Sequence, residues 1–293
     1  MGEGTKISWA HNTFNPWWGC SKVSPACENC YAESVANRWD FNVWGKKAPR
    51  RFFTEKHWNE PLKWNRAAEA EKIRQRVFCA SMADVFELRK DLDPWREKLW
   101  DLVEKTPWLD WMLLTKREKA IQKLLPAAWL KAPRPNVWLG VTAENQRRAE
   151  ERIPELLSVP AVVHWISAEP LLGPINFEPW FYGAQHDVTH DGVDAPDGAV
   201  AGGEERTGDR WFRTTGIDWV IVGGESGAGA RRMDPAWARD ILDQCKRHHV
   251  AVHFKQKGQV LAAEMGCKDK AGKDSSEWPA EFQIQEFPEP EAA

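Results

Sequence analysis

Short apolar runs alternate with amphipathic stretches along most of the chain. Each run is four to six residues long, ends in small or polar residues, and is followed by a charged segment with helical periodicity. Buried strands that alternate with helices are typical of a parallel sheet with helices packed outside it. The runs lie within residues 6–14, 77–81, 110–117, 136–145, 161–175, 217–227 and 250–258.

About seven such units predict an α/β fold, a partial or nearly complete (β/α) barrel. An open, doubly wound sheet is the alternative. We expect one barrel-like domain over residues 1–260. A Gly-, Asp- and Ala-rich stretch at about 182–215 interrupts the rhythm, and we interpret it as a flexible insertion. Residues 261–293 are acidic and Pro-rich toward their end, and we expect a loosely attached C-terminal tail.

Three of the six cysteines lie in one stretch, WWGCSKVSPACENCY. Cys27 and Cys30 form a C-x-x-C pair, and Cys20 lies upstream with six residues between. Pro25 predicts an irregular loop up to Cys27, followed by a helix whose dipole lowers thiol pKa values. Three thiolates can hold a [4Fe–4S] cluster with one iron open. The alternatives are a redox dithiol and a zinc site completed by a distant His.

Composition narrows the class of protein only in part. The net charge of −3 over 293 residues does not indicate a nucleic-acid-binding protein, although residues 44–58 are basic and aromatic. Nineteen Trp residues exceed the needs of a core, so we expect some to line a pocket. The chain has no apolar run of about 18 residues and no leader, which predicts no membrane span and a reducing cytoplasm.

Polar residues follow nearly every predicted strand. In parallel β/α folds the functional residues collect just beyond the carboxyl ends of the strands. Any one of these residues could simply cap a helix or form a turn. As a set, however, they would surround the same open end of the barrel, at the carboxyl ends of the strands. The residues are Ser81, Asp84, Glu87, Thr115, Lys116, Arg117, Thr142, Glu144, Ser167, Glu169, Glu225, Ser226, Lys255 and Gln256.

Several longer motifs resemble those of a known family. The cysteine stretch, with FCASMADVFE, WMLLTKR, VWLGVTAEN, ISAEPLLGPI and IVGGESGAGAR, resembles the phage-associated family with a three-cysteine motif, of unknown function. That family is in turn similar to the radical S-adenosylmethionine (SAM) superfamily, most closely to its spore photoproduct lyase branch. The usual spacing there is C-x3-C-x2-C, whereas this chain has C-x6-C-x2-C.

This resemblance implies that Cys20, Cys27 and Cys30 ligate a [4Fe–4S] cluster whose open iron binds SAM. An electron donor would reduce the cluster, SAM would be cleaved, and the 5′-deoxyadenosyl radical would abstract hydrogen from the substrate. Ser81 and Lys116 match SAM-contacting positions of the lyase branch. We add Thr142 and Glu169 to the cofactor pocket. Cys79 lies near, but not in register with, the hydrogen-donor cysteine of that branch, and we name it a candidate hydrogen donor.

The leading substrate prediction is a nucleobase, free or in DNA. Glycines 223–224 would let a ligand approach the backbone, and we expect Glu225, Arg231 and Lys255 on the substrate side, with Arg and Lys pairing with phosphate. The basic segment 46–56 could extend that surface. Two rival readings stay open. One is a non-catalytic phage protein that binds zinc or nucleic acid, and the other is a nucleotide or phosphate-ester enzyme with structural cysteines.

Overall fold

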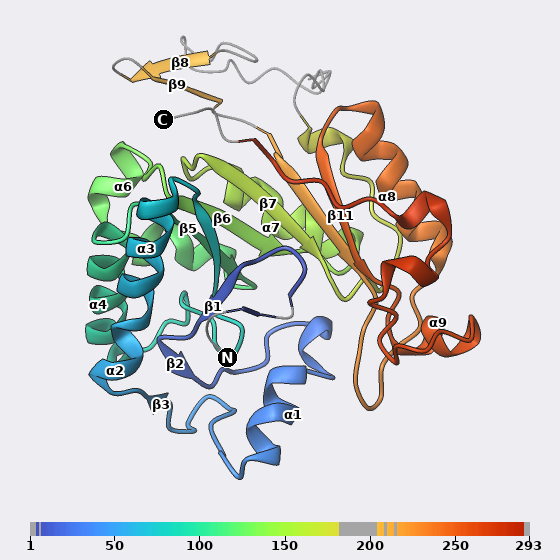
Figure 1. The fold of residues 1–293 in the computed structure, drawn as a ribbon, viewed down its shortest axis with the longest axis horizontal. Coiled ribbons are helices and arrows are strands. Elements are labelled where there is room, and N and C mark those ends of the chain that lie inside the picture. The colour runs from blue at the N-terminus through green and yellow to red at the C-terminus, as the bar shows by residue number, and fades with distance from the viewer. Residues whose placement is uncertain (1–3, 6, 182–203, 208–209, 214–215, 290–293) are drawn as a thin grey trace, which may run out of the picture.

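A single curled sheet of parallel strands organises the protein. The computed structural model describes residues 4–5, 7–181, 204–207, 210–213 and 216–289. The sheet order is β1-β4-β5-β6-β7-β10-β11, and its end strands β1 and β11 do not pair with each other, so the sheet forms a half-barrel (Figure 1). Its strands are β1 (Asn12–Phe14), β4 (Gln75–Cys79), β5 (Leu109–Thr115), β6 (Val137–Thr142), β7 (Val163–Ala168), β10 (Trp219–Gly223) and β11 (Ala251–Gln256).

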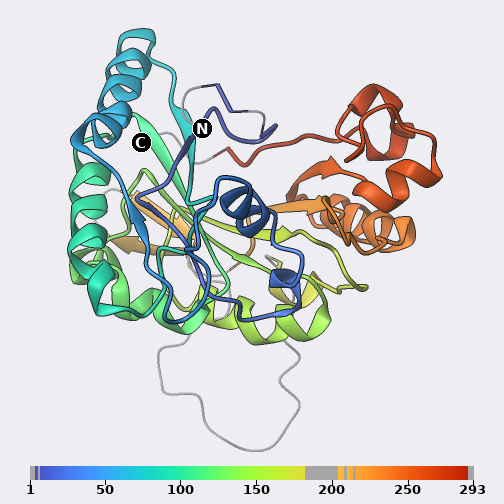
Figure 2. The same ribbon diagram turned by 90° about the horizontal axis from the view of Figure 1, so that it is seen from below.

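The strands follow the chain order across the sheet. A doubly wound sheet would instead reverse its order at the first strand, so the barrel-type prediction is confirmed in its partial form. Helices cover the outer side of the curve, as Figure 2 shows for the arc from α3 to α7. They are α2 (Glu55–Trp58), α3 (Glu60–Glu71), α4 (Asp93–Glu104), α5 (Ile121–Leu124), α6 (Ala127–Lys131), α7 (Gln146–Leu157) and α8 (Pro235–Arg247).

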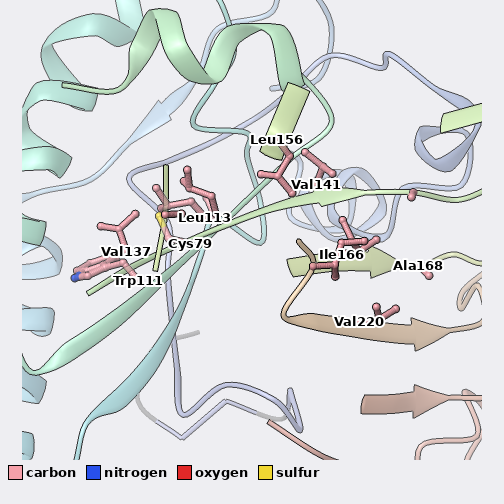
Figure 3. Packing of buried hydrophobic residues seen from close by; sticks show 14 of the residues in the cluster. Cys79, Trp111, Leu113, Val137, Val141, Leu156, Ile166, Ala168 and Val220 are labelled. Carbon is pink, nitrogen blue, oxygen red and sulfur yellow. The ribbon is translucent and has the colours of Figure 1, made fainter. Parts of the chain in front are cut away.

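Alternate residues of each strand face opposite sides of the sheet. Outward residues such as Leu113, Val141 and Ile166 pack under the helices in the main core (Figure 3). Inward residues form a second cluster on the concave side, and it is rich in indole rings. Its members include Trp9, Phe78, Met112, Trp138, Trp165, Trp219 and Ile221.

The indole rings on the concave side require a glycine on β6. A Cβ atom at Gly140 would lie 2.4 Å from the Trp165 ring, so only glycine lets that ring cross the strand. Trp9 then closes the cluster, with its ring centroid 4.6 Å from that of Phe78 and 5.6 Å from that of Trp165. The expectation that Trp residues line a pocket is confirmed for Trp9 and Trp44, whereas most of the Trp residues are core.

The C-terminal segment packs on β11. Helix α9 (Gln259–Glu264) follows the strand, and the rings of Trp278 and Phe282 are buried at 4.9 and 4.8 Å from that of Phe254. The backbone N–H groups of Phe254 and Glu286 donate to Ile284 and Val252. The expectation of a loosely attached tail is therefore wrong for residues 261–289, because buried aromatic rings anchor them.

The predicted insertion at about 182–215 lies mostly outside the described residues. Its described parts, β8 (Glu204–Thr207) and β9 (Arg210–Arg213), pair as an antiparallel hairpin. Within the ranges that the structure describes, no helix combines the length and apolar character needed to cross a membrane.

Candidate cofactor and substrate cavity

A cavity of about 660 Å³ opens on the concave side, at the carboxyl ends of the strands. Nine of the eleven side chains expected at the site line it, and Cys79 and Arg231 do not. Thr5, Ile7, Ser8 and Trp9 of the N-terminal segment also contribute to the wall. The nine are Cys20, Cys27, Cys30, Ser81, Lys116, Thr142, Glu169, Glu225 and Lys255.

The cysteine loop, residues 19–31, lies along this cavity. It begins after β2 (Trp17–Trp18), which pairs with β3 (Arg51–Phe52). Gly19 has φ +116°, and a Cβ there would lie 2.4 Å from the carbonyl oxygen of Val43, so the turn requires glycine. Only a short 3-10 turn, Pro25–Cys27, interrupts the loop.

Helix α1 (Tyr31–Arg38) begins after the last cysteine, not at Cys27 as the sequence predicts. Cys30 is the extended residue just before the helix. The physical reason lies at Asn29, whose side-chain amide donates to Glu225 and to the carbonyl of Gly229 at 3.1 and 2.7 Å. These long-range bonds hold the residue just before Cys30, and the extended Cys30 separates the 3-10 turn at Pro25–Cys27 from α1.

Three charged side chains, which we call clamps, hold the cysteine loop in place. The first clamp, Arg117, follows the end of β5. Arg117 donates to the carboxylate of Asp84 at 2.7 Å, to the carbonyl of Ser21 at 2.8 Å, and to the Cys20 sulfur at 3.5 Å. Thr115 also donates to Asp84, at 2.8 Å. Burial raises the pKa of the Cys20 thiol to about 12, although the Arg117 charge acts in the opposite direction.

The second clamp is a buried ion pair between Glu144 and Arg152, at 2.8 Å. The other carboxylate oxygen of Glu144 accepts from the backbone N–H of Ala26, between Cys20 and Cys27. Burial by itself would raise the pKa of Glu144, but the Arg152 charge and the hydrogen bonds keep it below its usual value. Glu144 is thus an ionised anchor for the loop.

The third clamp is Arg231. Its guanidinium donates to Glu225 at 2.9 and 2.6 Å, to Glu28 at 3.0 Å, and to the carbonyl of Pro25 at 2.9 Å. These bonds engage each of its nitrogens within the protein, and Arg231 does not line the cavity, so its pairing with phosphate stays a prediction. Glu225, likewise expected on the substrate side, lines the cavity but uses its carboxylate to hold Arg231 and Asn29.

The two arginines of the basic segment 46–56 are engaged within the protein, whereas its lysines are exposed. Arg50 is 5% exposed and donates to Glu87 at 2.8 and 3.1 Å. The guanidinium of Arg51 lies over the rings of Trp18 and Phe41, 4.8 and 4.2 Å from their centroids. Both arginines of the predicted phosphate surface are thus bound within the protein, Arg50 to a buried carboxylate and Arg51 to an aromatic cluster.

Lys116 differs from these paired residues. It lines the cavity, and among the described residues its ammonium has no ion-pair or hydrogen-bond partner. Burial raises the pKa of Cys30, and the Lys116 charge is one of the influences that lower it. Ser81 lies close by, where its hydroxyl accepts from Asn15 and its carbonyl accepts from the Tyr31 hydroxyl at 2.9 Å.

The wall formed by β7, β10 and β11 carries a second set of polar groups. The Lys255 ammonium donates to both carboxylate oxygens of Glu169, at 2.7 and 2.8 Å. Around the cavity, four buried side-chain atoms of lining residues have no hydrogen-bond partner in the described structure, namely the Trp9 Nε1, the hydroxyls of Thr13 and Thr142, and the Gln256 Oε1. Sequence reasoning missed Thr13, because β1 is only three residues long and gives no strand-end signal.

Cys79 is not at the site. Its side chain is fully buried among Trp111, Leu113 and other outward-facing residues, under the helices (Figure 3). The register of β4 turns position 79 away from the cavity and Phe78 toward the concave side. The structure therefore does not bring Cys79 to the cavity where the expected hydrogen donor would lie.

The three cysteines of the loop are the candidate donors for a metal centre. All three cysteines of the loop are free thiols of intermediate exposure. Within the described residues, no three His, Cys, Asp or Glu side chains are grouped closely enough to hold one metal ion. The three cysteine thiols line one cavity, and they are the donors that a three-cysteine cluster would use.

Comparison with known proteins places the chain in a family. Residues 4–281 match the model of a family described as a protein of unknown function, DUF5131. The chain belongs to that family. No curated protein and no solved structure matches it. The match covers the sheet, the cysteine loop and the C-terminal segment up to residue 281, so one family model includes all of these parts.

Proposed function

We propose that this protein is a radical SAM-type enzyme in which Cys20, Cys27 and Cys30 hold a [4Fe–4S] cluster. One observation carries the proposal: three thiols of one loop and an unpaired lysine line the same cavity. When bound, the cluster and SAM would supply a radical able to abstract hydrogen from a substrate. An electron donor for the cluster is part of the proposal.

The chain's own residues would bind and orient SAM. Lys116 can form a charge-assisted hydrogen bond with the SAM carboxylate, since no carboxylate of the described residues neutralises it. The hydroxyl of Thr142 is buried without a partner and can donate to or accept from the cofactor. Ser81 adds a polar group beside Lys116. The Trp9 and Phe78 side chains add apolar surface to the cavity wall.

The clamps would keep the three thiols in place. Arg117 contacts the Cys20 sulfur and offsets part of the negative charge that three thiolates introduce. Glu144 and Arg231 hold the backbone of the loop at Ala26 and Pro25, just before Cys27. These residues act as positioning residues for the proposed cluster.

Anaerobic reconstitution with iron and sulfide tests this proposal. We expect about four irons per chain and a broad absorption near roughly 400 nm, as thiolate-bound clusters show. Incubation with SAM and a reductant should then release 5′-deoxyadenosine. Replacement of Cys27 by Ala should abolish both, whereas Cys267→Ala, outside the loop, should leave both unchanged.

Two results would contradict the proposal. Stoichiometric zinc, with no iron uptake under anaerobic conditions, would indicate the zinc-binding alternative. A fully loaded cluster that yields no 5′-deoxyadenosine with SAM and reductant would remove the radical step.

A further inference from the structure

The Glu169–Lys255 pair bridges two strands that are not neighbours. Glu169 follows β7 and Lys255 belongs to β11, with β10 between them. The pair can form because β10 ends in glycine, and a Cβ at Gly223 would lie 3.3 Å from the Glu169 carboxyl group. Both side chains remain about one fifth exposed, at 17% and 20%, and both line the cavity. A ligand in the cavity can therefore reach both charges.

A β-bulge brings a further group to the same wall. The register between β10 and β11 shifts at Gly223, which pairs with Gln256 where regular pairing would give Lys255. As a result Lys255 and Gln256 both line the cavity, although adjacent strand residues ordinarily face opposite sides. The Gln256 amide nitrogen donates to the Gly224 carbonyl at 2.8 Å, so its oxygen is held in a fixed direction.

This wall is rich in acceptors. The Gln256 Oε1 is buried and has no donor, and Gln256 as a whole is 2% exposed. Each oxygen of Glu169 accepts from one ammonium and retains a further lone pair. The only cation of the group is Lys255. A phosphate would meet a carboxylate here, whereas a ligand that brings N–H donors beside one acceptor oxygen would satisfy the group.

We propose that this wall recognises the substrate through a nucleobase edge of the guanine type, with two adjacent N–H donors beside a carbonyl. The N–H donors would bind the Glu169 carboxylate, and Lys255 would donate to the carbonyl oxygen, as lysine does to O6 of guanine in nucleic-acid complexes. The Gln256 oxygen accepts a remaining amino hydrogen. This inference rests on the proposed function, for which it names the substrate class.

Comparison of three nucleosides tests this inference. Calorimetry would measure guanosine, inosine and adenosine binding to the full chain, both without iron and after reconstitution. Inosine lacks the exocyclic amino group, so guanosine should bind at least about tenfold more tightly, which corresponds to about 1.4 kcal/mol. Adenosine should bind more weakly still, because it offers an acceptor where guanosine has its ring N–H.

A matched pair of variants locates the site. Glu169→Gln should weaken guanosine binding at least about tenfold, because one carboxylate oxygen becomes a donor. Glu178→Gln makes the same change on the surface, where Glu178 pairs with Arg247, and should leave guanosine binding unchanged. Thermal unfolding would verify that both variants are folded.

Equal affinity for guanosine and inosine would overturn the inference, and so would unchanged guanosine binding by a folded Glu169→Gln variant. Absence of guanosine binding at millimolar concentration would overturn it as well. Because binding to the iron-free chain involves neither iron uptake nor SAM cleavage, failure here is distinguishable from failure of the proposed function. The comparison among nucleosides uses the unaltered chain and does not depend on whether a variant folds.

Discussion

Lys116 and Arg117 are adjacent in the chain but have different roles. Arg117 has a planar group that donates in several directions, and it joins Asp84 to Ser21 of the cysteine loop. Lys116 carries a compact charge and has no partner among the described residues that line the cavity. Arg117 therefore stabilises the loop, whereas the ammonium of Lys116 is available to a ligand in the cavity.

Replacement of Lys116 by Ala should weaken SAM binding. A hydrogen bond to a charged group contributes about 1.5–3 kcal/mol, so the dissociation constant should rise by roughly one to two powers of ten. Titration of SAM into cluster-loaded protein would measure this. Lys273→Ala is the control, because Lys273 also borders the cavity but is exposed to water. Unchanged affinity in the Lys116 variant would remove this residue from the cofactor site.

At the scale of elements, the cysteine loop is held mainly by other elements. Apart from one 3-10 turn it has no regular structure, and its backbone accepts from or donates to side chains beyond β5, β6 and β10. Each clamp includes a charged group that is buried or half-buried, for which leaving a partner unpaired is costly. The geometry of the loop therefore depends on strand ends far along the chain.

Loss of the third clamp should loosen the loop while the sheet stays intact. In an Arg231→Met variant, Glu225 and Glu28 lose their partner, so thiol labelling of Cys27 should become several-fold faster and the reconstituted protein should retain less iron. Arg232→Met is a close control, because Arg232 pairs with Glu264 at the surface. Equal labelling rates in both variants would show that Arg231 does not hold the loop.

The sequence predicts the strands better than it predicts the use of their polar ends. Runs of outward and inward apolar residues fix β4 to β11, since burial on both faces leaves a continuous apolar pattern. The same run of letters cannot show that Arg231 pairs with Glu28 or that Arg50 pairs with Glu87, because these partners meet only after folding. The anchored tail was predictable in part, since Trp278 and Phe282 stand out in an otherwise acidic segment.

At the scale of the whole molecule, both ends of the chain span the open side of the half-barrel. The Ser8 hydroxyl lies 2.8 Å from the His253 ring nitrogen, which joins the N-terminal segment to β11. From β4, the Arg76 guanidinium lies 3.9 Å from the ring centroid of Phe287 and donates to the carbonyl of Trp9. The edges that do not pair through strands are thus joined through side chains.

This connection should make stability depend on pH. Burial, with the charges of Lys255 and Arg76, lowers the pKa of His253 from 6.5 to about 4. The unfolded chain therefore binds a proton before the folded one does. The contribution of neutral His253 to the free energy of unfolding is fully present above pH 6.5. It decreases as the pH falls toward 4, by roughly 3 kcal/mol in total.

Urea unfolding at pH 7 and pH 5 would measure this loss. His253→Gln should reduce the difference between the two pH values, because glutamine can still bond to Ser8 and does not titrate. His249→Gln should behave as the unaltered chain, since His249 is exposed. If the His253 variant loses as much stability on acidification as the unaltered chain, His253 is not the group responsible.

The three clamps also determine when, during synthesis, the cysteine loop can reach its final geometry. Arg117, Glu144 and Arg231 reach residues of the loop that precede them by 96, 118 and 206 positions. During translation the three cysteines leave the ribosome early. Most of the remaining chain must then be synthesised before Arg231, the last clamp, can contact the loop. If the loop holds the proposed cluster, these thiols would have to stay reduced and free of other metals while synthesis continues. Insertion of the proposed cluster would then follow only near the end of translation.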